Sequence, residues 1–249
     1  GSEMCIRDRF LLMLSKTKLR PTREDRRLDR EILSEIFTIG LPALGTTFVS
    51  CFGYIAFARM VSGMGTTIFA AHSIAITAEQ IVYIPGYGLR VATSTLVGNA
   101  LGEKDIRKLK ATERVSILIT LLIMVVNGIG LYLFAYPFMR LFTNSVNAAR
   151  IGSEMLRLVS FSEPFFGLMI VLEGISYGMG RTKHVFACEA VSMWGIRIFG
   201  TFLCVNVFGL GLKAVWLCMI ADNICKAILL YIFRPKHVEE NADDRGALR

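Results

Sequence analysis

An uncharged run of twenty residues, Ile117 to Tyr136, is the feature that most constrains how this chain can fold. As a helix rising about 1.5 Å per residue it is about 30 Å long, which matches the hydrocarbon layer of a bilayer. Five further segments are long and apolar enough to cross that layer. We place the six spans at residues 36–60, 69–98, 115–136, 155–178, 185–207 and 212–233. The sequence therefore predicts an all-α, polytopic membrane protein.

The composition supports the same class. The chain of 249 residues is 53% hydrophobic and only 19% charged, and its mean hydropathy is +0.52, values that are unusual for a soluble domain. No arrangement of a nucleophile, a base and an oxyanion site is visible, so we expect no enzyme. The six cysteines form no CxxC pair and have no metal-ligand spacing with the three histidines. They are typical of buried small residues and do not indicate a disulfide framework or a cofactor.

Lysine and arginine gather in the loops on one side of the predicted spans, and short loops of this kind stay in the cytoplasm. The basic residues of that side are Lys16, Lys18, Arg20, Arg23, Arg26, Arg27, Arg30, Lys104, Arg107, Lys108, Lys110, Arg114, Arg181, Lys183, Arg234 and Lys236. The opposite side has only Arg140, Arg150 and Lys213. Both termini are therefore expected to be cytoplasmic. This asymmetry explains the net charge of +8, and a nucleic-acid partner is not expected, because no basic stripe interleaved with exposed aromatics lies outside these loops.

Composition also divides the chain. Residues 1–9 are polar and join abruptly to FLLML, so they are interpreted as a cloning or sequencing scar. Residues 10–35 look like the end of a truncated helix followed by a charged cytoplasmic connector. Residues 36–236 contain the six predicted spans, and residues 237–249 form a polar cytoplasmic tail.

The second span carries a polar stripe. Separations of seven, eleven and eighteen residues put Glu79, Tyr83 and Arg90 within roughly 20° of His72 on a helical wheel. Ionisable groups cost several kcal/mol in hydrocarbon unless they face a wet cavity or each other, so this stripe indicates a solute or ion pathway. The structural alternative is a hydrogen bond or ion pair from Glu79 to His72 or Arg90, which would hold the helix without transporting anything.

Several motifs occur in an order that resembles a known family. They are IGLPALG (39–45), AAHSIA (70–75), IPGYGL (84–89), ATSTLVGNALGEKD (92–105), LFT (141–143), SEPFF (162–166), GISYGMGRT (174–182), WGIRI (194–198) and GLKAVW (211–216). Over about residues 31–236 the chain is similar to the second half of a multidrug and toxic compound extrusion (MATE) transporter. The resemblance implies the C-terminal six-helix lobe of a twelve-helix protein. It also implies export of amphipathic or cationic small molecules by alternating access, in exchange for Na+ or H+.

The resemblance further implies a place and partners for this chain. The expected place is the plasma membrane, the inner membrane in a bacterium, and the expected partners are the lipid bilayer, the substrate and a missing N-terminal lobe. Two alternatives remain open. One is a lipid-linked precursor flippase of the same superfamily, which would show a strongly basic cavity. The other is a non-transporting membrane fragment.

Two carboxylates are the main candidates for ion and substrate binding. The TAEQ context of Glu79 matches an acidic position of the family, and a carboxylate at mid-span could exchange a proton, hold Na+ or pair with a cationic substrate. Glu163 precedes Pro164, whose missing N–H frees a carbonyl, as in the broken helices that transporters place beside ions. A wet, hydrogen-bonded carboxylate at a helix end is its structural alternative. Tyr83, His72 and Arg90 complete the predicted cation and substrate site.

The chain also departs from the family pattern. Ser50 stands where several subgroups have a glutamate, eight residues after Pro42, so coupling is expected to depend on Glu79, Glu163 or an acidic residue of the missing lobe. We expect Asp222 to pair with Lys226 four residues later. For Arg197 we expect snorkelling or pairing with backbone carbonyls.

Overall fold

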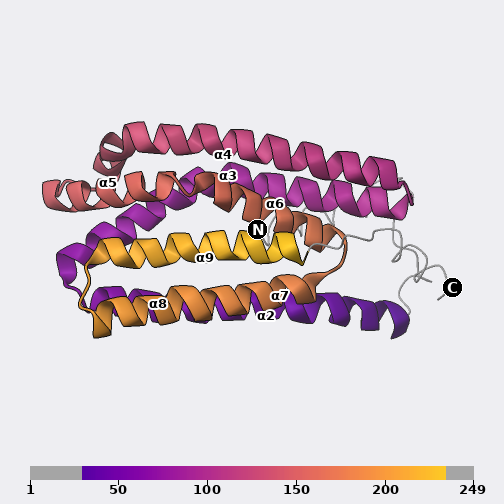
Figure 1. Ribbon diagram of the computed structural model, residues 1–249, viewed down its shortest axis with the longest axis horizontal. Coiled ribbons are helices and arrows are strands. Elements are labelled where there is room, and N and C mark those ends of the chain that lie inside the picture. The colour runs from indigo at the N-terminus through magenta and orange to yellow at the C-terminus, as the bar shows by residue number, and fades with distance from the viewer. Residues whose placement is uncertain (1–29, 234–249) are drawn as a thin grey trace, which may run out of the picture. The chain divides into compact units, whose positions relative to one another are not determined.

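The computed structural model describes residues 30–233, and every regular element in this range is helical (Figure 1). The elements in chain order are α2 (Arg30–Ser62), α3 (Thr66–Gly102), α4 (Ile106–Phe142), α5 (Val146–Ser160), α6 (Glu163–Gly178), α7 (Thr182–Ser192), η2 (Met193–Ile198), α8 (Phe199–Phe202), η3 (Leu203–Val207) and α9 (Leu212–Ile232). The chain separates into one unit that ends at Thr38 and another that begins at Ile39. The arrangement described below concerns residues 39–233. The interpretations of residues 1–9, of residues 10–29 and of the tail 237–249 lie outside the described residues.

Five helical segments are long and apolar enough to cross a membrane: Ile36–Ser62, α3, α4, Thr182–Val207 and α9. The pair α5 and α6 supplies a sixth span if the two helices count as one. The all-α, polytopic prediction is therefore confirmed. Most of the helices extend beyond the predicted spans, because helical structure continues past the apolar part of each segment.

The fourth predicted span is not continuous. α5 ends at Ser160, α6 begins at Glu163, and the two axes are bent by 61° at the break. Pro164 has no N–H to donate and is tolerated in the first turn of α6, so the break lies just before it. Ser162 caps the preceding turn by donating its N–H and its hydroxyl to the carbonyl of Val159, at 2.7 and 2.8 Å.

The fifth span contains two π-helical stretches, η2 and η3, on either side of the single turn α8. A π-helical turn contains an extra residue and rotates the side chains that follow it relative to an α-helical wheel. Arg197 lies in η2 and Cys204 lies in η3. Neither stretch was predicted, because hydropathy does not distinguish a π-helix from an α-helix.

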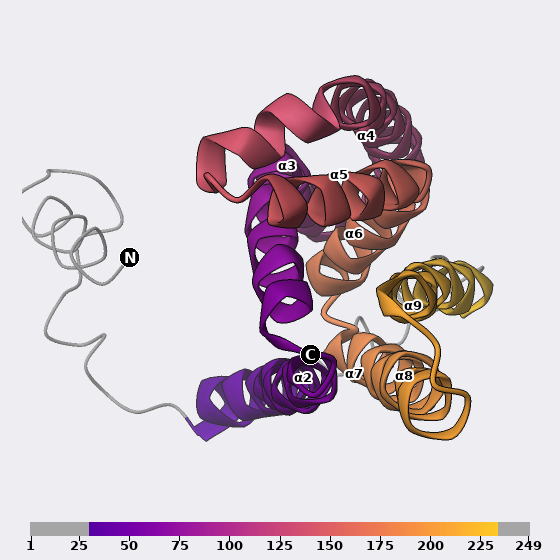
Figure 2. The same ribbon diagram turned by 90° about the vertical axis from the view of Figure 1, so that its left-hand side faces the viewer.

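Packing within residues 39–233 centres on α3 and α6. α3 contacts α4, α5 and α6, and α6 also contacts α9. Viewed along the helices, α9 lies beside α7 and α8 (Figure 2). One buried cluster surrounds Trp216 of α9 and includes Phe57 and Met139. A second cluster surrounds Ile170 of α6 and includes Met124.

Two glycines let α6 approach α3 closely. A Cβ on Gly174 would lie 2.7 Å from the carbonyl oxygen of Arg90, and one on Gly178 would lie 2.5 Å from that of Ser94. Backbone cannot move away as easily as the end of a side chain. Small residues at such contacts are typical of helix pairs in membranes.

We therefore predict that Gly178→Ala lowers the free energy of unfolding by about 1–3 kcal/mol, because the added methyl group forces α6 away from α3. The measurement is the thermal unfolding midpoint of the purified protein in detergent. Gly88→Ala in α3 is the matched control, since a Cβ there meets no atom within 4 Å. Equal midpoints for the two variants would contradict the close contact.

Candidate functional site

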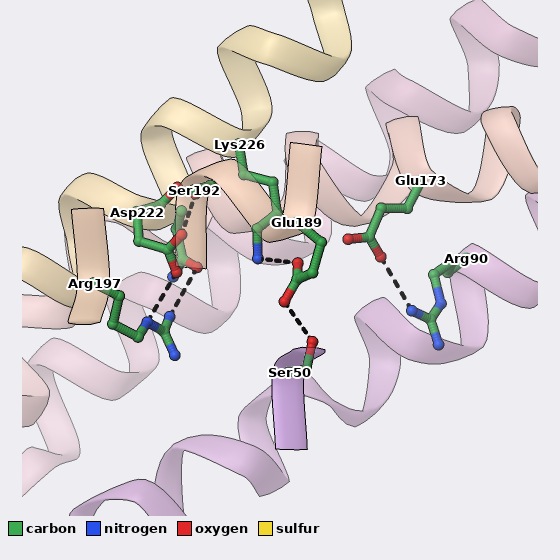
Figure 3. A network of polar contacts seen from close by, with 9 residues as sticks. Ser50, Arg90, Glu173, Glu189, Ser192, Arg197, Asp222 and Lys226 are labelled. Atoms are coloured by element: carbon green, nitrogen blue, oxygen red, sulfur yellow. Dashed lines mark hydrogen bonds and ion pairs between the residues drawn. The ribbon is translucent and has the colours of Figure 1, made fainter. Parts of the chain in front are cut away.

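In the network drawn in Figure 3, inside residues 39–233, three ion pairs join different helices. The Nε of Arg197 lies 2.8 Å from Oδ2 of Asp222, and the Nζ of Lys226 lies 2.5 Å from Oε2 of Glu189. The third pair joins a terminal guanidinium nitrogen of Arg90 to Oε2 of Glu173, at 3.1 Å. The pairs connect η2 with α9, α7 with α9, and α3 with α6. Each therefore holds two spans together in an environment where separated charges are costly.

The Arg197–Asp222 pair is buried. Ser192 donates its hydroxyl to the carboxylate of Asp222 and to its backbone carbonyl. The guanidinium of Arg197 lies over the rings of Tyr54 and Phe57 in α2, 5.5 and 5.8 Å from their centroids. The expectation of snorkelling or carbonyl pairing for Arg197 was wrong, because α9 presents a carboxylate to it.

The predicted pairing of Asp222 with Lys226 was also wrong. Asp222 is directed toward Arg197, and Lys226 reaches across to Glu189 in α7. The other oxygen of Glu189, Oε1, accepts a hydrogen bond from the hydroxyl of Ser50, at 2.5 Å. Glu189 was not among the candidate residues. The signal that could have found it is an acidic residue within the apolar segment 185–207.

Arg90 is directed toward a different partner from the one its wheel position suggested. Its carboxylate partner, Glu173, belongs to α6, and its guanidinium also lies 5.3 Å from the ring centroid of Tyr87. The side chain is 33% exposed, so this pair lies at the edge of the buried network. The structural alternative of a Glu79–Arg90 pair was therefore wrong.

Glu79 and Glu163 form no ion pair among residues 30–233, and the charge of Arg197 acts on Glu79 from its place beside Asp222. Glu79 is buried and accepts a hydrogen bond from the hydroxyl of Tyr83, whose ring stacks on Phe166 with centroids 3.7 Å apart. Glu163 is completely buried, and neither of its carboxylate oxygens has a hydrogen-bond partner among residues 30–233. The two carboxyl groups are close enough for their charges to interact.

His72 lies in the apolar core. The Nε1–H of Trp216 donates to Nδ1 of His72 at 3.2 Å, and the ring of Phe57 lies 5.5 Å away, centroid to centroid. A histidine that accepts at Nδ1 carries its proton on Nε2 and is neutral. His72 thus joins α3 to α9. The structural alternative of a Glu79–His72 contact was wrong, because the hydrogen-bond partner of Glu79 is Tyr83.

These contacts define what the interior can do chemically. Glu173, Glu189 and Asp222 are each paired with a basic side chain, whereas Glu79 and Glu163 form no ion pair among residues 30–233. Among residues 30–233 no group of three or more His, Cys, Asp or Glu side chains could hold a metal ion. A hard cation at Glu79 and Glu163 would therefore need neutral oxygens, such as hydroxyl or carbonyl groups or water, to complete its coordination.

The sequence profile of the MatE family matches residues 42–203. A probable multidrug resistance protein NorM from Thermotoga maritima is 30% identical over 201 residues, which cover 80% of this chain and 43% of the relative. A protein of the same name from Photorhabdus laumondii is 28% identical over 228 residues, which cover 90% of this chain and 50% of the relative. The chain thus spans about half the length of these curated relatives, or less.

Solved structures share the fold. A MATE protein in the bent conformation superimposes with a TM-score of 0.83 and 20% identity, over 93% of this chain and 51% of that one. A MOP superfamily transporter from Pyrococcus furiosus superimposes with a TM-score of 0.81 and 22% identity, over 90% of this chain and 50% of that one. At this identity the likeness concerns the arrangement of the helices.

We predict that Lys226→Met and Glu189→Gln each lower the free energy of unfolding by about 3–5 kcal/mol, because each leaves one buried charge without its partner. The free energy of unfolding of the double variant should fall by less than that of either single variant. Equilibrium unfolding of the four proteins gives the coupling energy.

Lys213→Met is the matched control. Lys213 pairs with Glu154 at 3.0 Å, but the two side chains are 71% and 45% exposed, so its loss should cost about 1 kcal/mol or less. Additive effects of the Lys226 and Glu189 substitutions would show that the buried pair contributes no coupling.

Proposed function

The chain belongs to the MatE family of membrane transporters, and we propose that it forms the C-terminal lobe of a cation-coupled exporter of amphipathic or cationic small molecules. The observation that carries this proposal is that Glu79 and Glu163 are two buried carboxyl groups that form no ion pair among residues 30–233, with the charge of Arg197, itself paired with Asp222, acting on Glu79. By contrast, each acidic side chain labelled in Figure 3, Glu173, Glu189 and Asp222, has a basic side chain beside it. A site that must bind and release a cation needs carboxylates left free in this way.

Coupling follows from repulsion between the two carboxylates. When both are ionised, two like charges face each other in a low dielectric, and the binding of H+ or Na+ relieves that repulsion. The hydroxyl of Tyr83 holds the ionised form of Glu79 by donating to it. A bound cation therefore stabilises one orientation of the transporter, and its release permits the other.

The break between α5 and α6 supports the same site. Glu163 is the first residue of α6, where the positive end of the helix dipole favours a carboxylate. The bend of 61° brings this helix end into the interior of the span. Discontinuous helices of this kind supply ion and substrate sites near the bilayer midplane in other transporters.

Amphipathic or cationic substrates fit the remaining surface best. α2 exposes Phe48, Phe52 and Tyr54, and aromatic faces bind organic cations through cation–π contacts. A flippase for anionic lipid-linked precursors would need free basic groups in the interior. Here Arg197 and Lys226 are both engaged by carboxylates.

We further propose that a second six-helix lobe completes the cavity, because the curated relatives are about twice as long as this chain and transporter sites lie between repeats. The protein then resides in the plasma membrane as a multi-pass exporter. Both ends of this lobe face the cytoplasm, as the lysine and arginine distribution indicates.

The proposal is tested by dye efflux from vesicles that contain the full-length parent protein, with Na+ and H+ gradients imposed separately. We expect gradient-driven efflux in the unmodified protein, and we expect Glu79→Gln and Glu163→Gln to reduce it to the level of protein-free vesicles. The amide that replaces the carboxylate can still form hydrogen bonds, but it is neutral, so it neither takes up a proton near neutral pH nor balances the charge of a bound Na+. The gradient that drives efflux identifies the coupling ion.

Glu103→Gln is the matched control, because Glu103 is an exposed loop carboxylate paired with Lys108 at 2.6 Å. It should transport as the unmodified protein does. Full efflux in both buried-site variants would place the ion site in the other lobe. The absence of efflux under either gradient in the unmodified protein would favour the flippase or a non-transporting role.

A further inference from the structure

Two cysteine thiols lie in contact where the fifth and sixth spans meet. The sulfur of Cys204, in η3, lies 3.7 Å from the sulfur of Cys218, in α9. Both residues are partly exposed, and both are free thiols in this structure. Neither residue contributes to the ion-pair network or to the Glu79–Glu163 site.

The backbone holds this pair close together. The turn that follows η3 is tied down by hydrogen bonds from the N–H of Phe208 to the carbonyl of Leu203 and from that of Leu210 to the carbonyl of Cys204. Gly209 adopts a positive φ of 61°, which lets the chain reverse sharply toward α9. Only the last three residues of η3, 205–207, separate Cys204 from this turn, so Cys204 stays near the start of α9.

Gly200 leaves the room for Cys218. A Cβ on Gly200 would lie 3.3 Å from the sulfur of Cys218, so a larger residue would press on that side chain. The bond length of a disulfide is about 2.05 Å, and the two sulfurs therefore need to close by about 1.7 Å. Closing this distance requires rotation of the two side chains about their Cα–Cβ bonds.

The position of the pair in the membrane makes it accessible to oxidants. Successive spans alternate in direction, so the turn before α9 lies on the side opposite to the lysine-rich turn between α3 and α4. By the loop-charge rule that side faces away from the cytoplasm. Thiols there are outside the compartment in which thiol reductants keep cysteines reduced.

We propose that Cys204 and Cys218 form an oxidisable dithiol whose disulfide links the end of the fifth span to the sixth. Its partner in the reaction is an oxidised dithiol reagent or oxidoreductase of the outer compartment. One cysteine thiolate attacks the reagent disulfide and forms a mixed disulfide, releasing one reagent thiolate. The second cysteine thiolate then displaces the remaining reagent thiolate. The protein loses two electrons and two protons, and the reagent disulfide is reduced to two thiols.

The linkage would fix the register between η3 and α9. It closes a loop around the turn and removes the freedom of α9 to slide along the π-helical end of the fifth span. This inference rests on the sulfur contact and on the proposed orientation of the lobe in the membrane, and not on its transport of any substrate.

The test is oxidation of the purified protein in detergent with oxidised glutathione or diamide, followed by alkylation of the remaining thiols and peptide mass mapping. We expect a Cys204–Cys218 cross-link, seen as a peptide pair that lacks two hydrogens and separates on reduction. Both cysteines should lose alkylation together. In Cys204→Ser the oxidant can add to Cys218 only as a mixed adduct, so no internal peptide cross-link should form.

Cys51 provides an internal control, because it is exposed and has no described thiol neighbour among residues 30–233. Its conversion to a mixed disulfide or an intermolecular dimer shows that the oxidant has acted. If Cys51 reacts while Cys204 and Cys218 stay alkylatable, the proposal is overturned. A cross-link that joins Cys188 to Cys225 in place of this pair would also overturn it.

Discussion

The ion pairs Arg197–Asp222 and Lys226–Glu189 connect the fifth span to α9 inside a layer that cannot solvate a lone charge. All four side chains are buried. Removing one member of a pair leaves the other as a lone buried charge. The free-energy cost of that charge is much larger than the net stabilisation that the intact pair provides. The positions of α7, η2 and α9 therefore depend on one another. Through the hydroxyl of Ser50, the position of α2 depends on the same group, since Ser50 donates to Glu189.

Glu79 and Glu163 differ from the ion-paired carboxylates of the interior. Glu173, Glu189 and Asp222 are each paired with a basic side chain, whereas Glu79 and Glu163 are buried and form no ion pair among residues 30–233. The hydroxyl of Tyr83 donates a hydrogen bond to one carboxylate oxygen of Glu79, and the ring of Tyr83 is fixed by stacking on Phe166. A neutral contact therefore orients Glu79, as the proposed cation site requires.

Breaks in helical regularity place the important side chains. The bend before Pro164 turns the start of α6 inward and carries Glu163 into the core. The π-helical turn η2 changes the direction in which the fifth span presents Arg197, so that its guanidinium meets Asp222 and the aromatic rings of α2. Local departures from the α-helix are common at functional sites for this reason.

The sequence by itself determined the helical class, the six apolar segments and the buried stripe from His72 through Glu79 to Tyr83, because hydropathy and wheel position are local properties of a helix. Pro164, in the first turn of α6, likewise indicated a broken helix from the sequence. Only the tertiary structure decided which charges meet. Asp222 and Lys226 are four residues apart, yet each is paired with a side chain from another span, and Arg90 is paired with Glu173 rather than with a neighbour on its own helix. Partner choice depends on how helices rotate and pack, and on π-helical turns that shift the wheel, and neither is encoded in the spacing of residues within one segment.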